Sequence, residues 1–210
     1  MARDDNLPAK SSDREIGDFL RKVAAAPAPR PETGQRGRLL FAIDATASRE
    51  PTWDMATHIQ SEMFVETEGL GGLDVQLVYY RGFGEFRASP WIGESDALVK
   101  RMTAVRCRGG RTQIRKLLRH ALKETRKQKI GALVFVGDAL EEDIDAVCHV
   151  AGELGLMGVP AFIFHEGGDP SVGQGFQQIA QLTGGACCRF DASSAKQLRD
   201  LLAAVAVYAA

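Results

Sequence analysis

One carboxylate and two hydroxyls stand at alternate positions early in the chain, at Asp44, Thr46 and Ser48. The five residues before them, 39–43, are all apolar and predict a strand that is buried on both faces. The three polar side chains would therefore begin at the carboxyl end of that strand. Hard oxygen ligands on one short loop suit a hard divalent cation. The segment thus indicates a site that binds a cation without redox chemistry.

Two later segments carry the same kind of ligand. Residues 109–112 read Gly-Gly-Arg-Thr, a glycine turn that presents the Thr112 hydroxyl before a predicted helix. Asp138 comes directly after a second buried strand and its closing glycine. In open α/β sheets, ligands bind beyond the carboxyl ends of strands, where the strand order reverses. All three segments could therefore deliver oxygen ligands to one place.

The chain from residue 38 onward alternates between strand and helix patterns. Apolar runs predict strands at 39–43, 75–81, 131–136, 160–164 and 186–190, and residues 85–88 can return antiparallel after a Gly-Phe-Gly turn. Apolar residues at helical spacing predict helices at 50–68, 96–102, 115–127, 144–156, 176–183 and 194–208. This alternation predicts an α/β fold with a mostly parallel sheet and helices on both faces.

Together, the three polar segments resemble the metal-ion-dependent adhesion site of the von Willebrand factor A-type (VWA) domain. That site is written Asp-x-Ser-x-Ser, then Thr, then Asp, on three loops. Here Asp44, Thr46 and Ser48 match the first motif, Thr112 matches the threonine and Asp138 matches the final aspartate. The resemblance extends over residues 38–210 and includes the order of strands and helices.

The resemblance implies a doubly wound, Rossmann-like sheet of six strands with one antiparallel edge strand. It also implies a Mg²⁺ ion on the top face, a place that Mn²⁺ or Ca²⁺ could take. The hydroxyls would bind the metal directly, and the aspartates directly or through water. An Asp or Glu side chain of a protein partner would complete the coordination. The function implied is cation-dependent protein binding, without catalysis.

The chain departs from the family pattern at two places. Thr46 stands where serine is usual, and its methyl group stiffens the rotamer. Asp138 is followed by Ala-Leu-Glu-Glu-Asp in place of the usual glycine, so Glu141 and Glu142 add negative charge near the predicted metal. On the other side, Arg108 and Arg111 flank the glycine turn and could clamp a partner's carboxylate. The two glutamates could strengthen cation binding or repel an acidic partner. We name all four charged residues as candidates for partner binding.

A structural role is the alternative for several of these residues. Asp44, Thr46 and Ser48 are all residue types that cap helices, so they could form an N-cap cluster for the helix that follows. Thr112 could likewise be a plain N-cap for the next predicted helix.

The first 37 residues differ from the rest. Ser12 could cap a helix that begins at Asp13, and residues 16, 19, 20 and 23 give it an apolar face. The Pro-rich segment after it reads as an extended linker. We therefore divide the chain into an N-terminal amphipathic helix with its linker, 1–37, and a VWA-like domain, 38–210. The helix could dock on its own domain or serve as a tethered docking helix for a partner.

Composition restricts the location and the partners. The net charge is −1, no apolar run is long enough to span a bilayer, and the N-terminal residues lack the apolar core of a signal peptide. The four cysteines form no Cys-x-x-Cys pair, so we expect them to be reduced. These features predict a cytoplasmic protein without membrane insertion. The oligomeric state does not follow from them.

A basic stretch offers a second function. Residues 100–129 contain twelve Lys and Arg and a single acid, Glu124. This charge could bind an anionic partner, either nucleic acid or an acidic protein, with the metal site vestigial. No aromatic residues interleave with the charges, which argues against stacking on single-stranded nucleic acid.

The sequence supports an enzymatic function less well than a binding function. A buried strand that ends in Asp also opens the haloacid dehalogenase-type site, where that Asp is the nucleophile. That pattern needs a second carboxylate two residues later, and Thr46 stands there. No Gly-x-Gly-x-x-Gly follows the first strand, which argues against a dinucleotide site. We therefore expect a binding protein and no enzyme.

Overall fold

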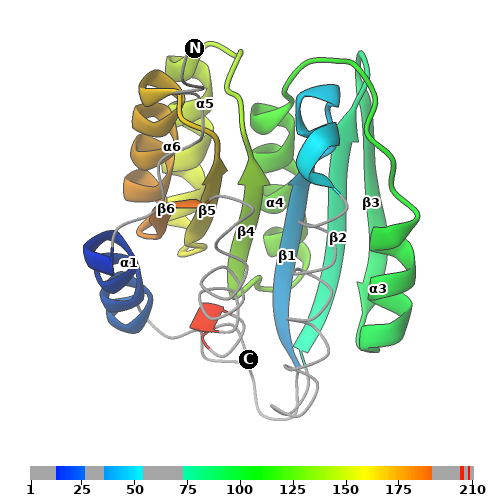
Figure 1. Ribbon diagram of the computed structural model, residues 1–210. Coiled ribbons are helices and arrows are strands. Elements are labelled where there is room, and N and C mark those ends of the chain that lie inside the picture. The colour runs from blue at the N-terminus through cyan, green and yellow to red at the C-terminus, as the bar shows by residue number, and fades with distance from the viewer. Residues whose placement is uncertain (1–12, 27–35, 54–72, 191–203, 206–207, 209–210) are drawn as a thin grey trace, which may run out of the picture.

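The computed structural model of the chain describes residues 13–26, 36–53, 73–190, 204, 205 and 208 (Figure 1). Within this part, one mixed sheet carries helices on both faces. The sheet consists of β1 (Gly37–Asp44), β2 (Leu73–Arg81), β3 (Glu85–Ile92), β4 (Ala132–Gly137), β5 (Ala161–Glu166) and β6 (Ala186–Phe190).

The strands lie in the order β3-β2-β1-β4-β5-β6. All neighbours are parallel except β2 and β3, which pair antiparallel at the edge. The predicted fold class is therefore confirmed: an α/β sheet of six strands with one antiparallel edge strand. Because β1 pairs with both β2 and β4, the strand order reverses beside it. Its last residue, Asp44, thus lies at the place where such sheets bind ligands.

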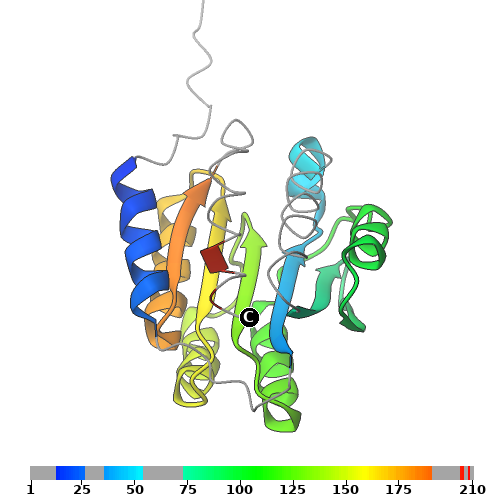
Figure 2. The same ribbon diagram turned by 90° about the horizontal axis from the view of Figure 1, so that it is seen from below.

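The helices are α1 (Asp13–Ala25), the 3₁₀ helix η1 (Ala47–Thr52), α3 (Ser95–Thr103), α4 (Ile114–Lys127), α5 (Ile144–Leu156) and α6 (Pro170–Thr183). One core cluster joins α1, α3 and one face of the sheet, and a second joins α4, α5, α6 and the other face. Figure 2 shows the two layers on either side of the strands. None of the helices in the described part of the chain is long and apolar enough to cross a membrane.

Helix α6 differs from its prediction in the residue at which it starts. Helix α6 begins at Pro170, six residues before the predicted start, because Asp169 caps it by accepting from the Ser171 N–H and proline suits the first helical position. Its two early glycines hide the helical pattern in the sequence. Of the predicted 50–68 helix, only the 3₁₀ start is described, and most of the predicted 194–208 helix lies outside the described residues, as does Ser12.

Helix α1 docks on its own sheet. Phe19 and Val23 are buried in the first core cluster. The Phe19 ring lies 5.9 Å from the ring of Phe162 and 5.3 Å from that of Phe164, both on β5. Figure 2 shows the helix beside β6 at the edge of the sheet. The aromatic contacts explain the apolar face that the sequence shows; the division of the chain at residue 37 stays a prediction.

This packing predicts a stability effect. Phe19→Ala should lower the free energy of unfolding by about 3 kcal/mol, because it empties a buried aromatic site. Urea unfolding measures the change. Leu20→Ala is the matched control, since Leu20 is on the same helix but 39% exposed and should change little. Equal effects of the two variants would contradict the docking.

Candidate functional site

Asp44 ends β1 with its carboxylate fully buried. Its Oδ1 accepts from the Thr46 backbone N–H at 2.8 Å, and its Oδ2 accepts from the Tyr80 hydroxyl at 3.0 Å. Tyr80 lies directly opposite Asp44 in the β1–β2 register. Burial raises the pKa of Asp44 to about 6, the hydrogen bonds from Thr46 oppose this, and the Asp138 charge adds to it. The sheet thus holds a desolvated carboxylate at its carboxyl edge.

The hydroxyls connect Asp44 to Asp138. Thr46 Oγ1 lies 3.0 Å from Ser48 Oγ. Burial raises the pKa of Asp138, while a hydrogen bond from the Ser48 hydroxyl lowers it. Within the described part of the chain, Asp138 Oδ1 is buried without a hydrogen-bond partner. Four of the five predicted metal ligands therefore gather at one place.

The loop that carries Thr112 reaches the same edge. The Arg108 N–H donates to the Ala45 carbonyl at 3.0 Å, which ties the loop to the residue after Asp44. Gly110 permits a close approach to the β2–β3 turn, since a Cβ there would come within 2.1 Å of the Gly82 carbonyl oxygen. The glycine turn therefore positions the loop against β2. In the part of the chain that the structure describes, Thr112 hydrogen-bonds to neither Ser48 nor Asp138.

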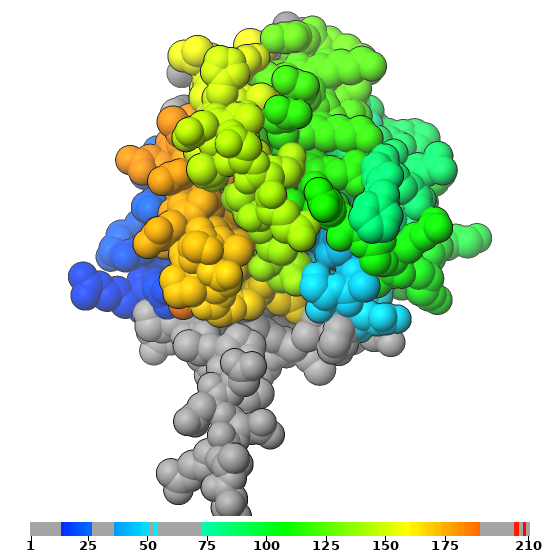
Figure 3. Space-filling model, turned by 90° about the horizontal axis from the view of Figure 1, so that it is seen from above, coloured from blue at the N-terminus to red at the C-terminus, as the bar shows by residue number. Residues whose placement is uncertain are grey.

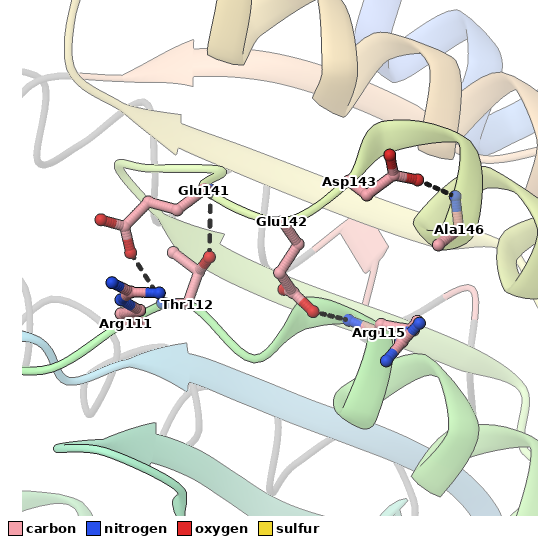
Figure 4. A pocket seen from close by; sticks show the side chains of 7 residues that line it. All are labelled: Arg111, Thr112, Arg115, Glu141, Glu142, Asp143 and Ala146. Carbon is pink, nitrogen blue, oxygen red and sulfur yellow. Dashed lines mark hydrogen bonds between the residues drawn. The ribbon is translucent and has the colours of Figure 1, made fainter.

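Thr112 is held instead by Glu141. The Thr112 N–H donates to Glu141 Oε2 at 3.0 Å, and the Glu141 N–H donates to Thr112 Oγ1 at 3.1 Å (Figure 4). This reciprocal pair joins the loop before α4 to the loop after β4. Because Asp138 lies three residues before Glu141, the pair brings Thr112 to the neighbourhood of the other four residues. One lone pair of the Thr112 hydroxyl is engaged in it.

Glu142 holds the start of α4. Its carboxylate accepts from the backbone N–H groups of Ile114 and, at 3.1 Å, Arg115. Helix α4 has Gln113 at its N-cap, and that side chain makes no capping hydrogen bond. Thr112 is therefore not the N-cap, and that interpretation was wrong because Glu142 supplies the capping oxygens from another loop. Both predicted partner-binding glutamates are engaged with backbone of their own chain.

The side chains of the first motif do not cap the helix that follows them either. Thr46 stands at the N-cap position of η1 but makes no side-chain capping bond. Its hydroxyl contacts Ser48, and the Asp44 carboxylate turns back on the Thr46 N–H. The side chains of this segment thus bind one another and Asp138, rather than the helix that follows.

The two predicted partner-binding arginines are exposed. Arg108 lies 3.8 Å from the Glu85 carboxylate. Arg111 lines a cavity of about 290 Å³ together with Thr112, Arg115, Glu141, Glu142 and Asp143 (Figure 4). Seen from above, the segment after β1, in cyan, lies against the green and yellow-green surface of its neighbours (Figure 3).

Two charged residues of the site escaped the sequence analysis. Arg49 is 1% exposed, and its Nε donates to Glu166 Oε2 at 2.7 Å. Its Nη1 donates to the Asp44 carbonyl at 2.7 Å, and its guanidinium lies 5.4 Å from the Trp53 ring centroid. The sequence around Arg49 and Glu166 contains no pattern that predicts their burial. A lone arginine in a polar segment is usually a surface residue.

The residues present fit a divalent cation. The buried Asp44 carboxylate and the half-buried Asp138 carboxylate both have raised pKa values, and the hydroxyls of Thr46 and Ser48 lie beside them. Asp138 Oδ1 has no hydrogen-bond partner among the described residues, so the set offers hard oxygen donors. Among the described residues, no three His, Cys, Asp or Glu side chains converge as a metal site. A cation here would therefore need the hydroxyls of Thr46 and Ser48 as ligands.

Comparison with known proteins places the fold. No protein-family model and no curated protein matches the sequence. The structure is similar to a von Willebrand factor type A protein from Catenulispora acidiphila, with a TM-score of 0.65 and 16% identity over 81% of this chain and 43% of that one. The SpRpn10 VWA domain matches with a TM-score of 0.58 and 12% identity over 75% of this chain and 88% of that domain.

The pilus adhesin SpaC from Lactobacillus rhamnosus GG is also similar, with a TM-score of 0.64 and 12% identity over 82% of this chain and 30% of that one. The chain thus spans less than half the length of two of these three proteins. At these identities the likeness concerns the fold. The domain has the VWA fold that the three polar segments had suggested.

A buried histidine next to Glu166 makes stability depend on pH. His165 is fully buried, and burial together with the Arg189 charge lowers its pKa to about 4. A histidine in the unfolded chain takes up a proton near pH 6.5. Its contribution to stability is therefore present above pH 6.5 and is lost as the pH falls towards 4.

Between pH 7 and pH 5, this group should remove about 2 kcal/mol from the free energy of unfolding. His165→Gln should lose that much less stability over the same range in urea unfolding. His149→Gln is the control, because His149 is exposed. If wild type and His165→Gln respond alike to pH, the histidine is not the cause.

Proposed function

We propose that this chain is a divalent-cation-dependent protein-binding module of the adaptor or assembly kind. The observation that carries the proposal is the cluster of Asp44, Asp138, Thr46 and Ser48 at the carboxyl edge of the sheet, with one buried Asp138 oxygen lacking a partner among the described residues. Carboxylates next to hydroxyls at such an edge suit Mg²⁺, with Mn²⁺ or Ca²⁺ as alternatives.

The side chains have distinct roles in this proposal. Thr46 and Ser48 offer neutral hydroxyl ligands, and Asp138 offers Oδ1, which has no hydrogen-bond partner in the described part of the chain. Both oxygens of Asp44 already accept hydrogen bonds, so Asp44 acts through water or as a fixed negative charge. Thr112 lies on the loop that Glu141 fixes and is the fifth candidate ligand. A bound Mg²⁺ would supply an electrophilic position for a carboxylate.

The partner would present an Asp or Glu to that position. Arg108 and Arg111 are exposed near the site and would attract such a carboxylate. Glu141 and Glu142 accept hydrogen bonds from backbone N–H groups, which reduces their repulsion of an acidic partner. The similarity in fold to a protein named as a pilus adhesin supports an interaction module. We assign the module to the cytoplasm and assign it no catalysis.

A second function has an observation of its own. Arg115, Arg119 and Lys123 are exposed at every fourth position of α4, so they form one basic stripe that starts beside the Thr112 loop. An anionic partner, nucleic acid or an acidic protein, could bind this stripe without a metal. Such binding would weaken steeply with salt.

A titration of the metal tests the proposed site. Mg²⁺ or Mn²⁺ added to the protein in a calorimeter should give binding heat, and Asp44→Ala should abolish it or weaken the affinity at least about tenfold, because a fixed negative charge is removed. Ser48→Ala removes one hydroxyl with less disturbance of the core and should also weaken binding. Asp96→Ala, an exposed acid on α3, is the control. Equal heats for wild type and Asp44→Ala would refute the site.

Chelation separates the two functions. Proteins retained from a cell extract by the immobilised chain should be released by EDTA, and the Asp44→Ala chain should not retain them. If retention ignores EDTA but falls steeply with salt, and if Arg119→Glu abolishes it, the basic stripe is the binding surface and the metal-bridged proposal is wrong.

A further inference from the structure

A buried arginine side chain, Arg49, places a positive charge next to the candidate metal site. Arg49 follows Ser48 directly in the chain and is buried at 1% exposure. Its guanidinium donates to the Asp44 carbonyl and to the Glu166 carboxylate, each at 2.7 Å. A buried arginine so close to buried carboxylates changes the field that any incoming cation meets.

The charge of Arg49 acts on both aspartates. It lowers the pKa of Asp44 and of Asp138, against the larger effect of burial. The negative charge of Glu166 raises the pKa of Asp138, and this effect is smaller than that of Arg49. Because the guanidinium donates directly to the Asp44 carbonyl at 2.7 Å and Glu166 binds the guanidinium at 2.7 Å, the positive end of the ion pair is the end joined to Asp44.

Burial lowers the local dielectric constant, so the electrostatic interactions between Arg49 and the aspartates are stronger than they would be at the surface. Arg49, Glu166 and the Asp44 carboxylate are all buried. Water therefore screens little of the field between them. A fixed positive charge at this place favours the ionised aspartates in the absence of a metal, and it repels a divalent cation that binds beside them.

We propose that the Arg49–Glu166 ion pair sets the divalent-cation affinity of this site, with Arg49 lowering the affinity and Glu166 raising it. The proposal rests on the proposed function, because it concerns the same cation. It assigns both residues as positioning and affinity-determining residues that do not contact the metal.

The two single variants should shift the affinity in opposite directions. Mn²⁺ titrated in a calorimeter should bind Arg49→Met about tenfold more tightly than wild type, because a positive charge is removed and Glu166 remains. The same titration should show Glu166→Gln binding about threefold more weakly, because Arg49 loses its counter-charge. The double variant Arg49→Met/Glu166→Gln should lie between Arg49→Met and wild type. A merely structural role would weaken binding in both single variants.

Controls separate charge from packing. Arg49→Lys keeps the positive charge and should bind Mn²⁺ like wild type, and Arg126→Met changes an exposed arginine of α4 and should have no effect. Because Arg49→Met leaves an unpaired buried carboxylate, it risks misfolding, which near-UV circular dichroism would detect. The double variant carries no unpaired charge at these two positions. If Arg49→Met misfolds, tighter Mn²⁺ binding by the double variant than by wild type supports the inference, and equal or weaker binding contradicts it.

The outcomes distinguish this inference from the proposed function. If wild type binds Mn²⁺, Asp44→Ala does not, and the Arg49 and Glu166 variants do not follow the expected order, only the inference is wrong. If wild type and Asp44→Ala both bind no Mn²⁺ but Arg49→Met does, Arg49 blocks the site in the native chain; the inference is then supported and the proposed function is wrong. If no variant binds the cation, the inference and the metal site are both overturned.

Discussion

Burial of the Asp44 carboxylate is the constraint on which the rest of the site depends. A charged group out of water must be compensated by hydrogen bonds or opposite charge, because its desolvation otherwise costs several kcal/mol. Thr46 N–H and the Tyr80 hydroxyl each satisfy one oxygen, and the Arg49 charge lies close by. Even so, burial and the nearby Asp138 keep the pKa raised. The negative charge of the buried Asp44 carboxylate is therefore not fully compensated, and a further positive charge nearby would stabilise it.

The topology explains why this uncompensated negative charge lies at the carboxyl edge. Parallel strands β1 and β4 end side by side, so Asp44 and Asp138 leave neighbouring strands in the same direction. Gly137 leaves room for the Phe135 ring of the same strand, which a Cβ there would meet at 2.6 Å, and such a Cβ would also lie 3.4 Å from the Asp44 Cβ. The Thr112–Glu141 pair then fastens the third loop to the second. Backbone pairing thus sets the geometry before any ligand binds.

The sequence predicted the strands better than the contacts between loops. Continuous apolar runs placed β4 and β5 within about two residues, because only a doubly buried strand needs such a run. The ligand candidates were found because hydroxyls and aspartates follow those strands. The hydrogen bonds of Glu141 to the Thr112 N–H and of Glu142 to the start of α4 could not be predicted, since a glutamate that binds the backbone of a distant loop or helix has no local pattern. Burial of Arg49 depends on Glu166, which is 117 positions away.

Stability alone is a weak explanation for that distant pair. Replacing a buried ion pair with apolar residues of similar size is often neutral or stabilising, because the desolvation of two charges offsets their attraction. The pair nevertheless lies beside a site that already carries the buried Asp44 and the half-buried Asp138. Its field reaches both of them, and Arg49 also anchors the carbonyl at the end of β1. A charge that is costly to bury and directed at Asp44 and Asp138 is better explained by what it does to the charge balance there than by packing. That balance decides how strongly the edge of the sheet attracts a cation.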